Sequence, residues 1–271
     1  MSKTLHAFKD GKAFIPFITA GDPDADTTVR DILAMADAGA DLIEVGIPFS
    51  DPTAEGPVIQ EADAIALKGG MTINGAFEVV ERVREVKPDL PLAFMTYVNT
   101  LFKYRGDAPA GVATEPYVPF FERCAKDGID AIILADVPFE EQDEVLAVSD
   151  KYGVDLISMV SPTSEDRIRE IAKNPRGFIY VVSSMGVTGV RSEFQFDHIE
   201  NMVRIIRETN PGVKCAVGFG ISTPDQARKM ASLSDGAIVG SAILRKIHAG
   251  ATTEEIADYV RSMKQAVMES M

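Results

Sequence analysis

Three acidic side chains lie close together where a buried strand is predicted to end. In residues 43–57, IEVGIPFSDPTAEGP, Glu44 follows an apolar pair, and Asp51 and Glu55 stand in the proline-rich segment after it. A carboxyl group among apolar neighbours has its charged form disfavoured, so it can exchange protons with a substrate near neutral pH. A strand-end Glu can equally be paired with a nearby cation or a backbone donor, and the residues alone leave both interpretations open.

Glycine-rich turns in the second half of the chain indicate a second kind of chemistry. SSMGVTGVRS (183–192), GFGIST (218–223) and GSAI (240–243) each follow a predicted strand, and Ser241 opens a helical pattern. Small residues let backbone N–H groups approach an anion closely, and the start of a helix favours negative charge. Three such turns at consecutive strand ends predict a phosphate site.

Metal and thiol chemistry find little support in the sequence. His6, His198 and His248 have no second ligand at metal spacing, so we expect surface histidines and no metal site. Cys124 and Cys215 belong to no CxxC or Cys/His cluster and are expected to be free thiols of a reducing compartment.

Composition and charge exclude several classes of protein. The 271 residues are 46% hydrophobic and 25% charged, as in a globular protein, and the formal net charge is −14 without a basic stripe for nucleic acid or an anionic membrane. No signal peptide or membrane-spanning run is recognisable, so a cytoplasmic protein is expected.

Eight short apolar runs predict buried strands that place these side chains. They occupy residues 13–19, 41–45, 91–95, 130–135, 155–160, 177–182, 213–217 and 236–240. Helical patterns lie between them, at 25–38, 74–86, 116–127, 140–152, 164–173, 195–209, 224–232 and 253–269. The alternation predicts a single (β/α)8 barrel domain over residues 1–271, with a doubly wound open sheet as the alternative.

Local signals predict where some helices begin and end. Gly39 is placed to cap the first long helix, and Thr223-Pro224 and Ser161-Pro162 have the chemistry of helix starts. Residues 99–120 are rich in Gly, Pro and Ala and are predicted to be a long loop.

Six motifs, in order along the chain, resemble those of the tryptophan synthase alpha chain family. They are PFITAGDP (16–23), EVGIPFSDPTAEGPVIQ (44–60), MTYVN (95–99), ILADVP (133–138), YVVSSMGVTGVR (180–191) and VGFGIS (217–222). The resemblance implies a (β/α)8 barrel with a short N-terminal helix. It also implies the retro-aldol cleavage of indole-3-glycerol phosphate to indole and glyceraldehyde 3-phosphate, with no cofactor in this chain. The expected partner is a beta chain that carries pyridoxal phosphate, in an α2β2 heterotetramer.

The resemblance also implies roles for individual residues. Glu44 corresponds to the general acid/base of the family, and Glu55 to the acid that binds the indole N–H. Asp51, Pro52 and Thr188 belong to the loops that close the site and face the partner. The indole pocket is expected from Phe17, Tyr97, Ile133, Ala135, Met159, Tyr180 and Phe219. The phosphate site is expected from Gly189, Gly218, Gly220, Gly240 and Ser241.

Two departures from the family pattern keep alternatives open. Glu55 stands where the family usually has Asp, which moves the carboxyl by about 1–1.5 Å unless the loop adjusts, and such a shift can cost about 100-fold in rate. The segment 104–117 is longer than usual and can add partner contacts or reshape the lid. The alternatives are a weakened chain that acts mainly as an allosteric partner, another phosphate-binding barrel such as an isomerase, and a lyase that works without a partner.

Overall fold

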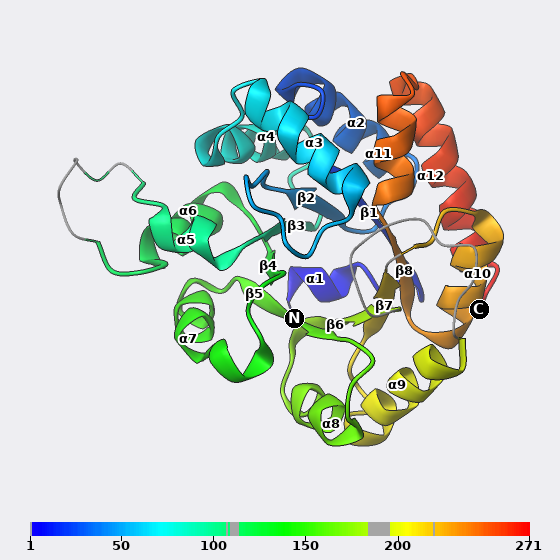
Figure 1. Cartoon of the computed structure of the whole chain (residues 1–271). Helices are drawn as coiled ribbons and strands as arrows, with labels where there is room; N and C mark the ends of the chain where they lie inside the picture. Colours follow the sequence, from blue (N-terminus) through cyan, green and yellow to red (C-terminus); the bar gives the residue numbers. More distant parts are fainter. Residues whose placement is uncertain (1, 107, 109–113, 184–195, 219) are drawn as a thin grey trace.

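The eight strands form one closed parallel barrel, seen in a computed structural model that describes residues 2–106, 108, 114–183, 196–218 and 220–271 (Figure 1). Strand β1 pairs with β2 on one side and with β8 on the other, which confirms the (β/α)8 barrel and excludes the open sheet. The strands are β1 (Ala13–Thr19), β2 (Ile43–Gly46), β3 (Leu92–Thr96), β4 (Ala131–Leu134), β5 (Asp155–Val160), β6 (Arg176–Val182), β7 (Cys215–Gly218) and β8 (Gly236–Val239).

Helices surround the barrel, as the right-handed connections between parallel strands require. The described helices are α1 (Lys3–His6), α2 (Ala25–Asp37), α3 (Pro57–Lys68), α4 (Ile73–Val86), α5 (Val98–Lys103), α6 (Val118–Asp127), α7 (Asp143–Tyr152), α8 (Glu165–Lys173), α9 (Phe196–Thr209), α10 (Pro224–Leu233), α11 (Ser241–His248) and α12 (Thr253–Met268), with a short 3₁₀ turn η1 (Phe139–Glu141). Strand β1 is buried along its whole length, as a strand between a barrel interior and a helical layer must be.

Helix ends follow the predicted chemistry at two of the three positions. Gly39 takes φ +103° directly after the C-cap of α2, a conformation that glycine adopts without strain. Thr223 caps α10 through a reciprocal capping box with Gln226. The prediction for Ser161-Pro162 is wrong, because Ser164 caps α8 by accepting the Arg167 N–H at 3.4 Å.

Two helices were not predicted from the sequence. Helix α3 begins at Pro57, whose missing N–H costs nothing in a first helical turn, so the proline-rich segment is shorter than expected. Helix α5 occupies residues 98–103 at the start of the predicted long loop, which corrects that prediction for its first part.

Helix α1 crosses the middle of the ring of strands in Figure 1, and its contacts to the first residue of β5 place it at the end of the barrel where the strands begin. The hydroxyl groups of Ser2 and Thr4 donate to the carboxylate of Asp155, the first residue of β5. Just beyond the helix, the ring of Phe8 packs 5.6 Å from that of Phe178. These contacts cover the amino end of the barrel and leave the opposite end, where the strands finish, to the functional groups.

Candidate active site

Glu44 is a buried carboxyl group in the wall of the barrel. It lies on β2 in register with Phe17 of β1 and Ala93 of β3, and 1% of the residue is exposed. Its Oε1 atom has no hydrogen-bond partner among the described residues. Burial, and next the charge of Glu55, raises the pKa of Glu44 well above its usual value. The raised pKa favours the protonated form of Glu44, from which the carboxyl group can give a proton to a ligand.

The loop after β2 brings Glu55 to the same place. Glu55 is 4% exposed, and its backbone carbonyl accepts a hydrogen bond from the Gln60 side chain at 2.7 Å. Its charge contributes to raising the pKa of Glu44 and of Tyr180, which places the three groups within electrostatic range of one another. The structure thus brings together the two acids that the sequence places eleven positions apart.

Tyr97 fixes the loop that carries Glu55. Its hydroxyl accepts the Ala54 N–H at 2.9 Å, one residue before Glu55. Its ring stacks on Phe49, with ring centroids 4.9 Å apart and an interplanar angle of 22°. The loop is therefore held at both ends by one tyrosine at the end of β3.

Two aromatic side chains predicted for the pocket pack against predicted phosphate-site glycines. A β-carbon on Gly218 would lie 2.3 Å from the Tyr180 hydroxyl oxygen, and one on Gly240 would lie 3.1 Å from the Phe17 ring. Both rings are 4% exposed. The neighbouring ring alone therefore accounts for glycine at residue 218.

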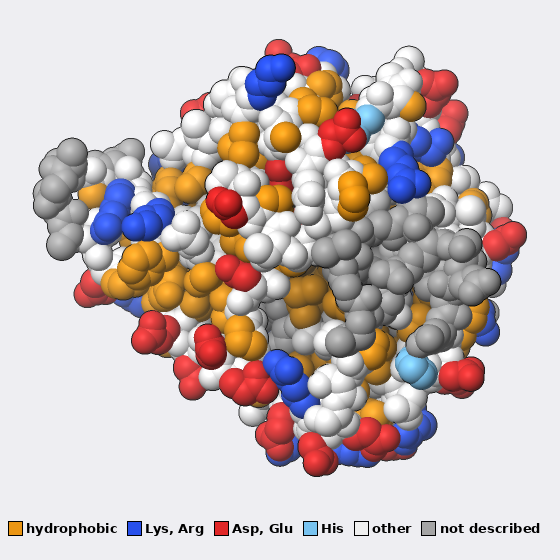
Figure 2. All heavy atoms as spheres, in the orientation of Figure 1, with side chains coloured by type: hydrophobic (Ala, Val, Ile, Leu, Met, Phe, Trp, Pro, Cys, Tyr) orange, Lys and Arg blue, Asp and Glu red, His pale blue; other side chains and the backbone are white. Residues whose placement is uncertain are grey.

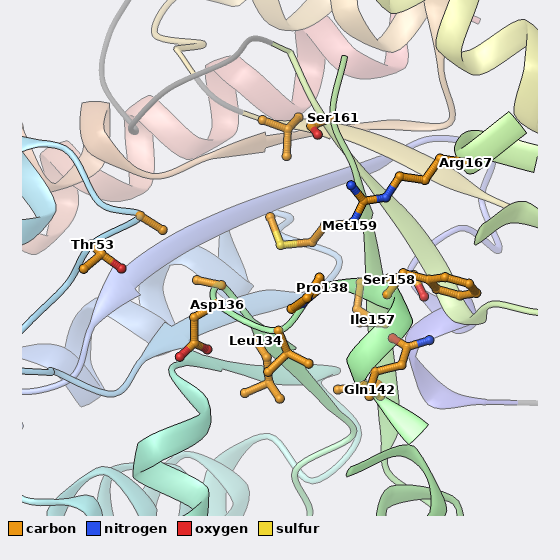
Figure 3. A pocket seen from close by; sticks show the side chains of 16 residues that line it. Thr53, Leu134, Asp136, Pro138, Gln142, Ile157, Ser158, Met159, Ser161 and Arg167 are labelled. Atoms are coloured by element: carbon orange, nitrogen blue, oxygen red, sulfur yellow. The ribbon is translucent and has the colours of Figure 1, made fainter. Parts of the chain in front are cut away.

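A cavity of about 540 Å³ opens at the ends of β4, β5 and β6, next to the β2–α3 loop that carries Glu55. Ala135 and Met159, both predicted for the indole pocket, line it, and Thr53 of the β2–α3 loop faces Met159 across the space (Figure 3). The cavity is also lined by Ala54, Leu134, Asp136, Val137, Pro138, Phe139, Gln142, Leu156, Ile157, Ser158, Ser161, Arg167 and Val182. It is largely apolar with a few polar groups, as small-molecule sites usually are.

The remaining predicted pocket and loop residues are more scattered. Ile133 is fully buried in β4 and does not line this cavity. Asp51 is exposed and accepts a hydrogen bond from Ser50 Oγ at 2.6 Å, and Pro52 is half-buried beside it. The predictions for Thr188, Gly189 and Phe219 fall outside the described residues.

The predicted phosphate turns meet at adjacent strands. Gly218 ends β7, and Gly220 takes φ +84° in the turn that follows. Gly240 follows β8 as the N-cap of α11, and Ser241, 9% exposed, is the first residue of that helix. Because β7 and β8 pair directly, a helix start and a glycine turn lie side by side, an arrangement suited to a phosphate group.

Two polar groups near the site were missed in the sequence. Asp63 is 5% exposed on the inner face of α3, and burial, followed by the Glu55 charge, raises the pKa of Asp63 to about 8. An acid on the apolar stripe formed by Ile59, Ala62 and Ala66 was the available signal. Asp136, directly after β4, accepts the Val98 N–H at 2.9 Å and lines the cavity.

The expectation of a solvated His248 is wrong. Its Nε2 lies 2.8 Å from an oxygen of Asp22, which is fully buried, and its Nδ1 lies 3.6 Å from Glu61. His6 and His198 are exposed, as expected. Among the described residues no group of three His, Cys, Asp or Glu could hold a metal ion. Both cysteines are free and buried.

The chain forms a closed (β/α)8 barrel, and carboxyl groups, a cavity and glycine turns lie where its strands end. These features are typical of a barrel enzyme that acts on a small molecule. The family model described as "Tryptophan synthase alpha chain" matches residues 4–270, and the chain belongs to that family. The family's reaction cleaves indole-3-glycerol phosphate, so the chain is a lyase subunit of tryptophan biosynthesis, and an alpha chain implies a beta-chain partner.

Individual relatives agree with this assignment. The tryptophan synthase alpha chain of Lacticaseibacillus casei is 47% identical over 245 residues, which cover 90% of this chain and 86% of the relative. A solved structure of Mycobacterium tuberculosis tryptophan synthase matches with a TM-score of 0.86 at 28% identity, covering 98% of each chain. The alpha chain from Legionella pneumophila subsp. pneumophila matches with a TM-score of 0.83 at 31% identity, covering 99% of this chain and 98% of that one.

Proposed function

We propose that Glu44 is the general acid and base of this lyase and that Glu55 is its second carboxylate. The observation that carries the proposal is a carboxyl group 1% exposed at the end of the barrel where ligands bind, with one oxygen left without a partner among the described residues. A buried carboxyl that is protonated near neutral pH can begin a reaction by giving up its proton.

The cleavage leaves Glu44 in its starting protonation state, because Glu44 gives one proton to the substrate and takes up another from it. Glu44 donates its proton to the indole carbon that carries the glycerol phosphate side chain, and the ring becomes a cation. Glu44, now ionised, takes the proton of the neighbouring side-chain hydroxyl. The O–H electrons form the aldehyde C=O bond, while the electrons of the breaking C–C bond return to the ring. Indole and glyceraldehyde 3-phosphate leave, and Glu44 is protonated again.

Glu55 stabilises the positive charge that appears on the ring nitrogen after protonation. As an ionised carboxylate it accepts a hydrogen bond from the indole N–H, and such charge-assisted bonds are about twice as strong as neutral ones. Its burial beside Glu44 supports this role, since a charge interaction is stronger away from water.

The ends of the substrate are assigned to separate walls of the site. The indole ring is held by Phe17, Tyr97, Ile133, Ala135, Met159, Tyr180 and Phe219. The phosphate is held by Gly189, Gly218, Gly220, Gly240 and Ser241. The helix start at Ser241 and the glycine turn after β7 support the second assignment.

Residues at the rim are assigned to closure and to the partner. Asp51 and Pro52 are assigned to the contact with the beta chain, and Thr188 is assigned to closure of the site. The pyridoxal phosphate of an α2β2 heterotetramer belongs to that beta chain. Figure 2 shows hydrophobic side chains on this face near α5 and α6, and Phe102 is 45% exposed there. Residues 1–271 act as one barrel domain in the cytoplasm, and no helix in the described part is long and apolar enough to cross a membrane.

Indole release from indole-3-glycerol phosphate tests the two carboxylates. We expect Glu44→Gln and Glu55→Ala each to lower kcat by about 10²- to 10⁴-fold, the usual contribution of a positioned proton-transfer group. Both variants should still bind glycerol 3-phosphate, because neither carboxylate belongs to the phosphate site. A Glu55→Ala variant that keeps its rate would remove Glu55 from the mechanism.

The unusual Glu55 supports a second candidate function, a chain that acts mainly by binding its beta partner. The same assay separates the two, since a wild-type chain that stays inactive in the presence of beta chain would favour the binding function. Activity of the wild type alone would show that the longer side chain is accommodated.

A further inference from the structure

Tyr259 lies behind the predicted phosphate site, at the interface between α12 and the two elements that form that site. It is half-buried on α12, in a helix that none of the proposed site residues occupies. Burial raises the pKa of Tyr259, so its hydroxyl remains a hydrogen-bond donor at any physiological pH. Its hydroxyl contacts the turn after β7, and its ring contacts the last turn of α11, the helix whose first residue is Ser241.

The hydroxyl end contacts the turn after β7. Tyr259 Oη donates to the backbone carbonyl of Ser222 at 2.9 Å. The backbone N–H of Ser222 donates to Gln226 Oε1 at 2.8 Å, and the Thr223 N–H donates to the same oxygen at 3.2 Å. The turn that begins at Gly220 is therefore held from outside by one side chain of α10 and one of α12.

The ring face contacts the helix after β8. The ammonium nitrogen of Lys246 lies 4.8 Å from the centroid of the Tyr259 ring, within the range of a cation–π interaction. Lys246 belongs to α11, the helix that begins at Ser241 with Gly240 as its N-cap. The same tyrosine thus contacts the β7 turn through its oxygen and α11 through its ring.

We propose that Tyr259 is a positioning residue for the phosphate site, which holds the turn after β7 and the helix after β8 in the relative placement that one phosphate group requires. It touches no substrate atom and acts through Ser222 and Lys246. Backbone N–H groups select an anion only when they converge on it, so a small separation of the two halves weakens binding. The inference rests on the proposed function, because that proposal places the phosphate there.

Two substitutions separate the contributions of the hydroxyl and the ring. Tyr259→Phe keeps the ring over Lys246 but leaves the Ser222 carbonyl without its donor, and Tyr259→Leu removes both contacts. Tyr152→Phe is the matched control, because Lys151 lies 5.3 Å from the ring centroid of Tyr152 on α7, away from β7 and β8. Calorimetric titration with glycerol 3-phosphate measures phosphate binding without any chemical step.

The expected result is a graded loss of affinity. Tyr259→Phe should raise the Kd for glycerol 3-phosphate about fivefold, the equivalent of one hydrogen bond, and Tyr259→Leu should raise it further. KM for indole-3-glycerol phosphate should rise in parallel while kcat is kept, since Glu44 and Glu55 lie on another part of the barrel. Tyr152→Phe should change neither quantity.

Other outcomes would overturn the inference. If both Tyr259 variants bind within twofold of the wild type, or lose thermal stability without losing affinity, the tyrosine is only structural. A wild type that binds no glycerol 3-phosphate would overturn the phosphate site and this inference together. A wild type that binds glycerol 3-phosphate but releases no indole would overturn the lyase proposal alone. The Kd values of the Tyr259 variants would then still test the positioning role of Tyr259.

Discussion

Three buried acids on β2, in the loop after it and on α3 influence one another's proton binding. Glu44, Glu55 and Asp63 are 1%, 4% and 5% exposed, and the charge of Glu55 contributes to raising the pKa of the other two. Like charges in a poorly solvated space cannot all be ionised. Burial and the charge of Glu55 therefore both favour the protonated forms of Glu44 and Asp63, and the proposed reaction needs an acid.

Replacing Asp63 by Asn should change how stability depends on pH. The folded carboxyl keeps its proton up to about pH 8, whereas the unfolded one loses it near its ordinary value of 3.8. This group's contribution is therefore fully present below about pH 4 and is lost as the pH rises to 8. Between these limits the unfolding free energy of wild type should fall relative to Asp63→Asn by up to about 1.4 kcal/mol per pH unit. Urea unfolding at pH 5, 6 and 7 measures the difference, and parallel curves would contradict the raised pKa.

At the scale of elements, the site depends on loops that are held by neighbours far away in the sequence. The loop after β2 is fixed by Tyr97 at the end of β3, and the turn after β7 by Tyr259 of α12. In both cases a tyrosine hydroxyl bonds to the backbone of a loop. The barrel supplies rigid strand ends, and these contacts give the loops between them a defined shape.

Tyr97→Phe should reduce turnover more than it reduces binding of the phosphate end. The variant keeps the stacked ring but leaves the Ala54 N–H without its acceptor, so Glu55 is held less precisely. We expect kcat to fall about tenfold, because small misplacements of reacting groups are costly. Tyr104→Phe is the control, since its hydroxyl bonds to Asn74 instead of the loop after β2. Equal kcat for Tyr97→Phe and wild type would show that the loop keeps its shape without this bond.

At the scale of the whole molecule, segments far apart in the sequence are joined by polar contacts between side chains. Helix α1 covers the amino end of the barrel, while α11 and α12 bring the C-terminal region against β1. Near the other end of the barrel, His248 of α11 reaches Asp22 in the turn after β1 and Glu61 of α3. The contacts of His248 join the helix after β8 to the turn after β1 and to α3, in addition to the pairing of β1 with β8.

His248→Ala should destabilise the protein far more than an exposed histidine would. It leaves the fully buried Asp22 without the ring nitrogen 2.8 Å away, and a buried polar group that loses its hydrogen-bond partner commonly costs about 1–3 kcal/mol. His198→Ala, at an exposed position, should stay within about 0.5 kcal/mol of the wild type. Chemical denaturation at pH 7 compares the two, and equal losses would mean that Asp22 finds another partner.

The sequence was sufficient for the barrel because its strands are buried on both faces and read as short apolar runs. Glu44 could be found for the same reason, since an acid stands out at the end of such a run. The partners of Asp22 and Ser222 could not be found, because His248 lies 226 positions from the former and Tyr259 lies 37 positions from the latter. Helix α3 was missed because its start at Pro57 falls in a segment where prolines and acids suggest a loop.

The contact between Gly218 and Tyr180 has a consequence for the order in which this site can be altered. A methyl group at residue 218 would lie 2.3 Å from the tyrosine oxygen, so alanine is excluded there as long as the hydroxyl remains. Removing the hydroxyl first relieves part of the overlap, although ring carbons at 2.6 and 2.7 Å still oppose the methyl group. Only a smaller side chain at 180 makes room for alanine at 218. Any redesign that shortens residue 180 therefore also opens the turn after β7 to side chains that it now excludes. If the proposed assignments hold, the indole end and the phosphate end of the substrate cannot be redesigned independently.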